Sequence, residues 1–216
     1  MSSPRVKYQT IEFDNTDIHV RSLRDNQEFS DDDGIAEALG ISSASWPLFG
    51  VLWDSGLVLA HQINTREFAG KRILEVGCGL ALASLLLNHR KADITVTDYH
   101  PEVGAFLDVN TELNGDPNIP FYRVGWADAA NDMGKFDIII GSDLLYEAEH
   151  IELLAAFLNQ HASEQCEIIL IDPGRGNHAK FSKRMTHLGW VHTQARPIEC
   201  DYTVKPFKGQ VLNYQR

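Results

Sequence analysis

The sequence predicts an α/β fold, doubly wound, in which helices cover both faces of a mostly parallel sheet. Short β-branched runs alternate with helical patterns along most of the chain, which is the order that a parallel sheet requires. The runs Ile73–Val76 and Ile138–Ile140 are apolar throughout, as in strands that are buried on both faces. A third observation is a glycine pair, Gly77 and Gly79, that lies directly between one such strand and a helical pattern.

The N-terminal part differs from this pattern. Tyr8–Phe13 and Asp17–Leu23 alternate between apolar and polar residues and flank a turn-like stretch, so we expect a β-hairpin. Ser30–Gly34 is polar and acidic, typical of a loop or a short helix start. We therefore expect residues 1–50 to form a hairpin and loop extension. Residues 51–216 then form the cofactor-binding domain, and both belong to one structural unit.

The elements of the main sheet follow in chain order. Strands are expected at Arg72–Val76, Ile94–Thr97, Phe121–Trp126, Phe136–Gly141, Glu167–Asp172, Trp190–Pro197 and Gly209–Tyr214. Helices are expected from about Leu52 to Ile63 and at Leu80–Asn88, Pro101–Asn114, Glu149–Gln160 and Asn177–Leu188. The last two strands lack a helix between them and should pair as an antiparallel edge.

Four residues have the chemistry of helix ends. Asp54 or Ser55 can cap the first of these helices. Pro101 has the position of a proline in a first helical turn, and Gly115 that of a glycine just after a helix.

Composition narrows the class of protein. The chain has 216 residues, a net charge of −11 and 44% hydrophobic residues. The acidic balance argues against nucleic acid as a partner. It suits a cationic substrate such as a lysine-bearing protein, although solubility alone also accounts for it. Cys78, Cys166 and Cys200 are widely spaced and the nine histidines show no ligand spacing, so we expect neither disulfides nor a metal site. No signal peptide and no membrane-spanning run are visible, so a cytoplasmic location is the default.

The segment Glu75–Ala81 has the pattern of a cofactor loop. It follows a strand and opens a helix, and glycines let a backbone turn sharply and approach a ligand. Asp98 ends the next strand, 21 residues after Gly77. An acidic side chain at this place can accept hydrogen bonds from both hydroxyls of a ribose. The pattern therefore predicts an adenosine-containing cofactor.

The residues around the loop favour S-adenosyl-L-methionine over NAD. Glu75 lies two residues before Gly77, where a carboxylate suits a cationic ligand and repels a pyrophosphate. The chain also lacks a second mononucleotide-binding half and a Tyr-x-x-x-Lys pair, both expected of a nicotinamide enzyme. Cys78, between the two glycines, is interpreted as a small filler of the loop rather than a nucleophile.

Several motifs resemble a known family. Ile73–Ala81 resembles motif I of class I (seven-stranded) methyltransferases, and Asp98 matches the acidic residue at the end of their second strand. Three further segments resemble the protein-lysine methyltransferase family 16. They are Leu52-Trp53-Asp54, Gly125-Trp126-Ala127-Asp128, and Ser142-Asp143-Leu144-Leu145-Tyr146 with its Asp-x-x-Tyr pattern.

The resemblance covers roughly Phe49 to Gly189 and has departures. Asp54 stands where relatives often have proline. Asp172–Arg175 is similar to a segment of the electron-transfer-flavoprotein lysine methyltransferases of this family but does not continue as theirs does. We interpret Arg175 either as part of an acceptor channel or as a solvated loop residue. The acceptor thus remains open at this stage.

The resemblance implies a seven-stranded Rossmann-like sheet and methyl transfer from S-adenosyl-L-methionine, which leaves S-adenosyl-L-homocysteine. It implies N-methylation of a lysine side chain in a protein, with Asp143 and Tyr146 positioning the acceptor as catalytic residues. Local alternatives are a helix cap for Asp143 and ordinary core packing for the two tryptophans. The expected cofactor-binding residues are Trp53, Glu75, Gly77, Cys78, Gly79, Asp98, Trp126 and Asp143.

Three other functions remain open. A methyltransferase for a small molecule or a protein N-terminus would need a closed lid over the acceptor, and residues 30–49 are the candidate. A non-catalytic module that binds a cofactor or a partner would not need the Asp143 and Tyr146 pair, and both are present. A small Rossmann oxidoreductase would be expected to bind NADH.

Overall fold

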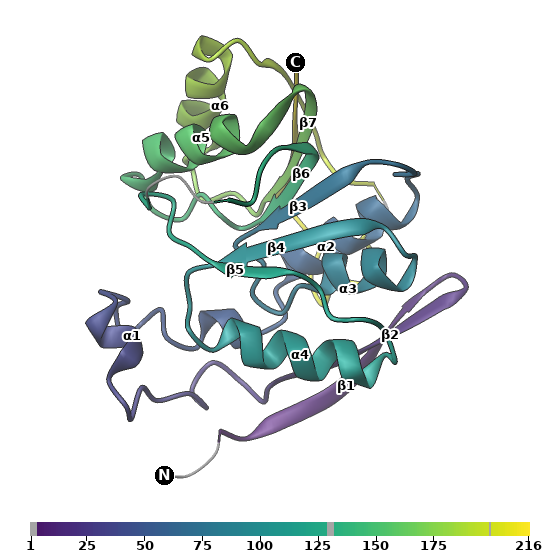
Figure 1. Ribbon diagram of the computed structural model, residues 1–216, viewed down its shortest axis with the longest axis vertical. Coiled ribbons are helices and arrows are strands. Elements are labelled where there is room, and N and C mark those ends of the chain that lie inside the picture. The colour runs from purple at the N-terminus through teal and green to yellow at the C-terminus, as the bar shows by residue number, and fades with distance from the viewer. Residues whose placement is uncertain (1–3, 129–131, 199) are drawn as a thin grey trace.

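The computed structural model describes residues 4–128, 132–198 and 200–216, and over these ranges it forms a hairpin and a seven-stranded sheet (Figure 1). The hairpin pairs β1 (Val6–Phe13) with β2 (Thr16–Leu23). The strand order of the large sheet is β5-β4-β3-β6-β7-β9-β8. Its strands are β3 (Arg72–Val76), β4 (Asp93–Asp98), β5 (Phe121–Arg123), β6 (Phe136–Ser142), β7 (Ala162–Asp172), β8 (Val191–Ala195) and β9 (Gln210–Gln215).

The strand order places a binding edge at the centre of the sheet. From β3 the chain moves outward to β4 and β5, then returns to pair β6 on the other side of β3. All these pairs are parallel, so the carboxyl ends of β3, β4 and β6 lie along one edge. In open α/β sheets, ligands bind at the edge where the strand order reverses. The reversal here lies between β3 and β6.

Helices cover both faces of the sheet, as predicted. The buried apolar side chains of the described residues form two clusters, one on each face. One cluster contains α2 (Asp54–Asn64), α3 (Leu82–His89) and α4 (Val103–Leu113). The other contains α5 (His150–His161) and α6 (His178–His187). Two short helices, α1 (Ile35–Ala38) and the 3-10 helix η1 (Leu48–Gly50), precede α2. Among the described residues, no helix combines the length and apolarity that crossing a bilayer needs.

The hairpin covers a helix that would otherwise expose apolar surface. Every residue of α3 from Leu82 to Asn88 is buried, which an amphipathic surface helix would not show. Ile18 and Val20 of β2 are fully buried in the same cluster as α3. The N-terminal extension therefore completes the hydrophobic core on this face of the sheet.

Two asparagines of α4 hold the outer edge of β2. Asn110 Nδ2 donates to the Arg21 carbonyl at 3.2 Å, and its Oδ1 accepts from the Arg21 amide at 2.7 Å. Asn114 makes the same pair of bonds with His19, both at 2.8 Å. The two side-chain amides, one helical turn apart, make the hydrogen bonds that a neighbouring strand would otherwise make with this edge of β2. They satisfy backbone groups that an open sheet edge leaves unpaired.

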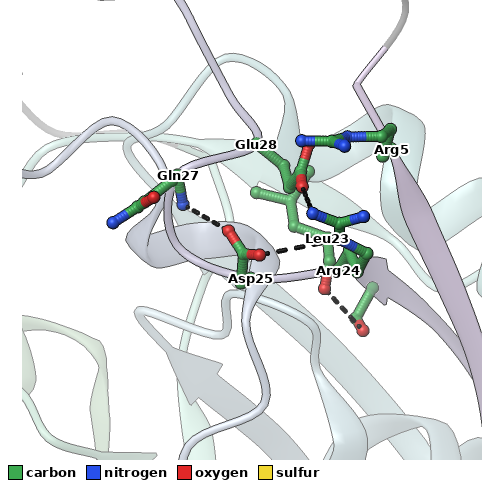
Figure 2. A network of polar contacts seen from close by, with 7 residues as sticks. Arg5, Leu23, Arg24, Asp25, Gln27 and Glu28 are labelled. Carbon is green, nitrogen blue, oxygen red and sulfur yellow. Dashed lines mark hydrogen bonds and ion pairs between the residues drawn. The ribbon is translucent and has the colours of Figure 1, made fainter.

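A network of charges fixes the base of the hairpin (Figure 2). The Glu28 side chain is nearly buried, and its Oε2 accepts from Arg5 Nε at 2.7 Å, while its Oε1 forms an ion pair with Arg24 Nη2 at 2.8 Å. Asp25 accepts from the Gln27 amide at 2.9 Å and lies 3.6 Å from Arg24 Nε. These contacts join the start of β1 to the segment that follows β2. The chain is thereby directed toward α1 and the carboxyl edge of the sheet.

Some predicted helix ends were wrong. The N-cap of α2 is Trp53, without a side-chain cap hydrogen bond, so neither Asp54 nor Ser55 caps the helix. Asp54 lies in the first turn instead, where a carboxylate favours the helix dipole. Pro101 precedes the N-cap of α4 and is not its first helical residue. The prediction for Gly115 is confirmed, because it follows the C-cap of α4 with a φ of 66°.

The strand predictions differ from the structure mainly in length. β5 ends at Arg123 rather than Trp126, because the chain turns at Gly125, whose amide donates to the Asp128 carboxylate. β7 begins at Ala162, five residues before the predicted start, and a register irregularity in β6 accommodates the extra length. The predicted antiparallel pair is confirmed, and β9 also pairs antiparallel with β7, so that β8 is the outermost strand.

We expect Asn110→Ala to destabilise the protein by about 1–3 kcal/mol, because it removes two hydrogen bonds and leaves the part-buried backbone amide and carbonyl of Arg21 without these partners. Urea unfolding followed by circular dichroism measures the change. Glu112→Ala, at an exposed position of the same helix, is the control. Equal unfolding midpoints for the two variants would contradict a structural role of Asn110.

Candidate functional site

The loop after β3 is held tightly between its neighbours. Gly77 and Gly79 have φ angles of 60° and 50°, a backbone region that disfavours other residues. A Cβ on Gly77 would lie 2.5 Å from the Leu144 side chain, and one on Gly79 would lie 3.1 Å from the Phe49 carbonyl. The glycines are therefore needed for both conformation and space. The loop also brings backbone close to whatever binds at the edge of the sheet.

Glu75 connects the strand before the loop to the helix after it. Its buried Oε2 accepts hydrogen bonds from the Ser84 amide at 3.1 Å and from the Ser84 hydroxyl. Burial raises the pKa of Glu75 to about 7, although the bonds from Ser84 act in the opposite direction. The carboxylate thus joins the end of β3 to the first turn of α3. Its expected contact with a cofactor stays a prediction.

Cys78 lies between the two glycines and does not have the features of a nucleophile. Its side chain is buried, and burial raises the pKa of the thiol well above its ordinary value. Its amide donates to the Thr97 carbonyl at 3.0 Å, which ties the loop to β4. Cys78 is thus a small residue that fills the loop, in keeping with the interpretation of the sequence.

Asp98 lies at the end of β4, beside the glycine loop. Its Oδ2 accepts from the Gly79 amide at 2.9 Å, and its Oδ1 accepts from the His100 amide at 2.9 Å. The side chain is partly exposed, and burial of the carboxyl raises its pKa. Each oxygen makes one bond to the backbone and can accept another. The two oxygens can therefore accept from a pair of hydroxyl groups.

The segment before α2 packs against this part of the site, and it belongs to residues 30–49, which the sequence offered as a candidate lid over the acceptor. Phe49 of η1 is buried and stacks on His100, with ring centroids 4.1 Å apart. Burial lowers the pKa of His100 to about 4, so the ring is neutral at pH 7. Tyr99 donates its hydroxyl to the Leu39 carbonyl at 2.9 Å. The residues around Asp98 are thus packed against the chain that links the hairpin to α2.

The first turn of α2 reaches the same edge near the end of β6. Trp53 is partly exposed, and its Nε1 donates to the Leu48 carbonyl at 3.0 Å. A Cβ on Gly56 would lie 3.8 Å from the Ser142 hydroxyl. The hydroxyl of Ser55 is buried and has no hydrogen-bond partner within the described ranges of the chain. The start of α2 thus borders the end of β6.

An aromatic series lies at the start of α5. His150 makes edge contacts with Trp126 and Tyr146, at centroid distances of 5.4 and 6.1 Å. Trp126 is half-buried against the core cluster of α5 and α6. Tyr146 is 45% exposed, and burial of its hydroxyl region raises the pKa to about 12, so the phenol is neutral at pH 7. His150 brings two predicted site residues together, and no sequence motif identified it.

Asp143 follows β6 and has an unusual backbone. Its φ is 54°, and its amide donates to the Ile171 carbonyl at 2.9 Å. Both carboxylate oxygens accept from Arg175, whose Nε and Nη2 lie at 2.9 and 2.6 Å. The N-cap of the following helix is Glu149, so Asp143 is not a helix cap. The carboxylate is therefore held at the edge of the sheet by contacts unrelated to helix ends.

These residues come from different strands but end at one edge. The glycine loop follows β3, Asp98 ends β4, and Asp143 with Tyr146 follows β6. Parallel pairing of β3 with both β4 and β6 places the three loops side by side. The edge thus combines acceptors for a ribose with a second carboxylate and a phenol that can bind an amine.

The family model for lysine methyltransferases matches residues 42–187. The chain belongs to this family. Among curated relatives, a histone-arginine methyltransferase of Rattus norvegicus is 30% identical over 49% of this chain and 50% of its own. The electron transfer flavoprotein beta subunit lysine methyltransferase of Xenopus laevis is 27% identical over 63% and 55%. A protein N-lysine methyltransferase of Danio rerio is 26% identical over 60% and 63%. The chain thus spans between half and two thirds of the length of these relatives.

Solved structures share the fold. A magnesium protoporphyrin IX methyltransferase from Synechocystis PCC 6803 with bound S-adenosylmethionine has a TM-score of 0.58 and 19% identity, over 74% of this chain and 76% of its own. A putative methyltransferase complexed with S-adenosylhomocysteine has a TM-score of 0.67 and 14% identity, over 97% and 56%. At these low sequence identities, the structural similarity shows the fold alone.

We expect the stability of the protein to fall between about pH 5 and pH 8 because of Glu75. Its raised pKa means that the folded protein binds this proton more tightly than the unfolded chain does, so unfolding becomes easier as the pH rises from about 4.5 to about 7. Glu75→Gln keeps the shape but cannot ionise. Relative to this variant, the wild type should lose about 2–3 kcal/mol over the interval. Urea unfolding at both pH values tests this, and parallel pH dependence would contradict it.

Proposed function

We propose that this protein transfers a methyl group from S-adenosyl-L-methionine to a lysine side chain of a protein. The observation that carries the proposal is the arrangement at the carboxyl edge of the sheet. There, Asp98 at the end of β4 lies against the glycine loop. Asp143 and Tyr146 follow β6, which pairs with β3 on the side opposite β4. Membership of the lysine methyltransferase family supports the same reaction.

The residues at the edge fit the proposed cofactor. Asp98 suits the two ribose hydroxyls, because both of its oxygens can accept a further hydrogen bond. Trp126 offers a half-buried ring surface near the end of β5 for the adenine. The first turn of α2, with the buried Ser55 hydroxyl, supplies donors that suit a carboxylate. When bound, the cofactor supplies an electrophilic methyl group on a sulfonium ion.

The side chains near β6 suit the preparation of an amine. A lysine must lose a proton before its nitrogen lone pair can form the new bond to carbon, while the carbon–sulfur bond breaks and S-adenosyl-L-homocysteine leaves. Asp143 can bind the ammonium group, and it or water can then accept the proton. Tyr146, neutral and partly exposed, can orient the amine through its hydroxyl or its ring. The main contribution of the site is then proximity and alignment.

The names of the relatives differ in the amino acid that is methylated. The relative from Rattus norvegicus is named a histone-arginine methyltransferase, and those from Xenopus laevis and Danio rerio are named lysine methyltransferases. A small molecule or a protein N-terminus is also an outcome to be tested. Analysis of the methylated product decides between them, because methyllysine, methylarginine and a methylated α-amino group are separable after hydrolysis. We propose a soluble, cytoplasmic setting for the reaction.

The first test is calorimetric titration with S-adenosyl-L-methionine, S-adenosyl-L-homocysteine and NADH. We expect the two sulfur ligands to bind and NADH to give no heat. Incubation of the protein with a cell lysate and radiolabelled methyl donor then identifies the acceptor. Binding of NADH alone, or of none of the three, would overturn the proposal and leave only the fold.

We expect Asp98→Ala to weaken binding of S-adenosyl-L-homocysteine by at least about tenfold, since two charge-assisted hydrogen bonds to the ribose are lost. Calorimetry measures the affinity. Asp93→Ala is the matched control, because Asp93 begins the same strand at the opposite edge and is exposed. Unchanged affinity in Asp98→Ala would remove Asp98 from the cofactor site.

We expect Asp143→Asn to lower methyl transfer to the lysate acceptor by about a hundredfold, because an amide cannot hold the ammonium or accept its proton. Binding of S-adenosyl-L-homocysteine should change far less, since the amide keeps the size of the carboxylate and its oxygen can still accept a hydrogen bond from the cofactor. Asp137→Asn, near the other end of β6, controls for effects on the strand. Full activity in Asp143→Asn would exclude the residue from the mechanism.

A further inference from the structure

The loop between β7 and α6 carries Arg175 between two glycines. Gly174 and Gly176 have φ angles of 100° and 87°. A Cβ on either would meet no heavy atom within 4 Å in the described part of the chain. Steric crowding therefore does not require glycine at either position. The positive φ angles of the two glycines are a backbone region that disfavours other residues, and they shape the turn that presents Arg175.

Both ends of this loop are nonetheless fixed. The Gly174 amide donates to the buried Asp172 carboxylate at 3.1 Å. At the other end, Asn177 Nδ2 donates to the Leu145 carbonyl at 2.8 Å. The half-exposed Arg175 side chain extends from the loop between these two anchors. A change of its rotamer would therefore move the guanidinium and leave β7 and α6 in place.

Asp143, the ion-pair partner of Arg175, is the less exposed of the two residues. Asp143 is held through its backbone amide by β7, and its side chain is only 15% exposed. The Arg175 side chain is 46% exposed. The two side chains form a bidentate pair in which each carboxylate oxygen receives one N–H. A poorly hydrated carboxylate is thus neutralised by the guanidinium of a half-exposed side chain.

We propose that Arg175 is a specificity-determining residue that occupies Asp143 in place of the acceptor and gives way only to an acceptor with a positive charge. The proposal rests on the proposed function in one respect, namely that Asp143 binds the acceptor. A lysine ammonium that replaces the guanidinium exchanges one cation for another. A neutral acceptor would leave the carboxylate unpaired and poorly hydrated, which is unfavourable. The ion pair thereby excludes neutral acceptors.

Arg175 could instead serve only to orient Asp143, and the two roles have opposite consequences. If Arg175 occupies the acceptor's place, its removal frees Asp143 and strengthens cation binding. The apparent affinity of a ligand is reduced by the fraction of protein in which its site is free. If Arg175 orients Asp143, its removal loosens the carboxylate and weakens cation binding.

The test uses n-butylammonium, which has the end group of a lysine side chain, and n-butanol, its neutral counterpart. Binding is followed by NMR titration, with and without saturating S-adenosyl-L-homocysteine. We expect Arg175→Ala to bind n-butylammonium about fivefold to tenfold more tightly than the wild type. Neither protein should bind n-butanol. The gain should be absent from the double variant Asp143→Asn with Arg175→Ala.

Arg184→Ala is the matched control, because Arg184 also forms an ion pair at 2.7 Å and has a similarly exposed side chain, but lies on α6 with Glu152 as partner. Its affinity for n-butylammonium should equal that of the wild type. Equal, weaker or undetectable binding in Arg175→Ala would overturn the proposal. So would tight binding of n-butanol to the wild type. The titration needs no methyl transfer, so failure of the proposed function, seen as absent cofactor binding, is recognised separately.

Discussion

The loop at the centre of the site depends on one buried contact, between the carboxylate of Glu75 and the first turn of α3. Glu75 is the second-last residue of β3, whose neighbours on both sides also end at the site, and Ser84 lies in the first turn of the helix that follows the loop. The contact fixes the distance that Gly77, Cys78 and Gly79 must span. With both ends fixed, the Gly79 amide can reach Asp98 and the loop can tie β3 to β4. The cost is a buried acid whose pKa is about 7.

A second dependence connects the hairpin to the same loop. α3 is buried on all sides, which requires a cover on the face turned away from the sheet, and β2 supplies it. The chain then passes through η1, where Phe49 places its carbonyl against Gly79 and its ring against His100. The N-terminal extension therefore packs against the glycine loop as well as protecting the core. This explains why the loop glycine that faces Phe49 cannot be exchanged for a larger residue without movement of η1.

Sequence reasoning found the parts of the fold and site that are encoded locally. The order of strands and helices, Gly77, Gly79, Asp98 and the Asp143–Tyr146 pair all follow from short patterns at strand ends, because parallel strands bring their carboxyl ends to one edge. Contacts between distant segments leave no such pattern.

The asparagines that complete the edge of β2 look like any polar residues of a helix, although they lie about 90 positions away in the chain. Arg175 lies 32 residues after Asp143, and only the folded loop reveals the pair. The predicted N-terminal positions of two helices were wrong, because α2 begins after Trp53 and α4 after Glu102, and neither N-cap residue makes a side-chain cap hydrogen bond.

The charges at the edge suggest why the site suits a cationic ligand. Burial raises the pKa values of Glu75, Asp98 and Asp172, each of which lies at the end of a different strand. Acids whose pKa values are raised by burial mark a poorly hydrated region. A sulfonium ion or a lysine ammonium nearby would stabilise their charged forms, whereas the pyrophosphate of a dinucleotide would oppose them. Arg175 is a positive charge of the chain itself in this region, where it pairs with Asp143. In the scheme that we propose, its guanidinium neutralises the poorly hydrated Asp143 carboxylate until the ammonium group of an acceptor replaces it.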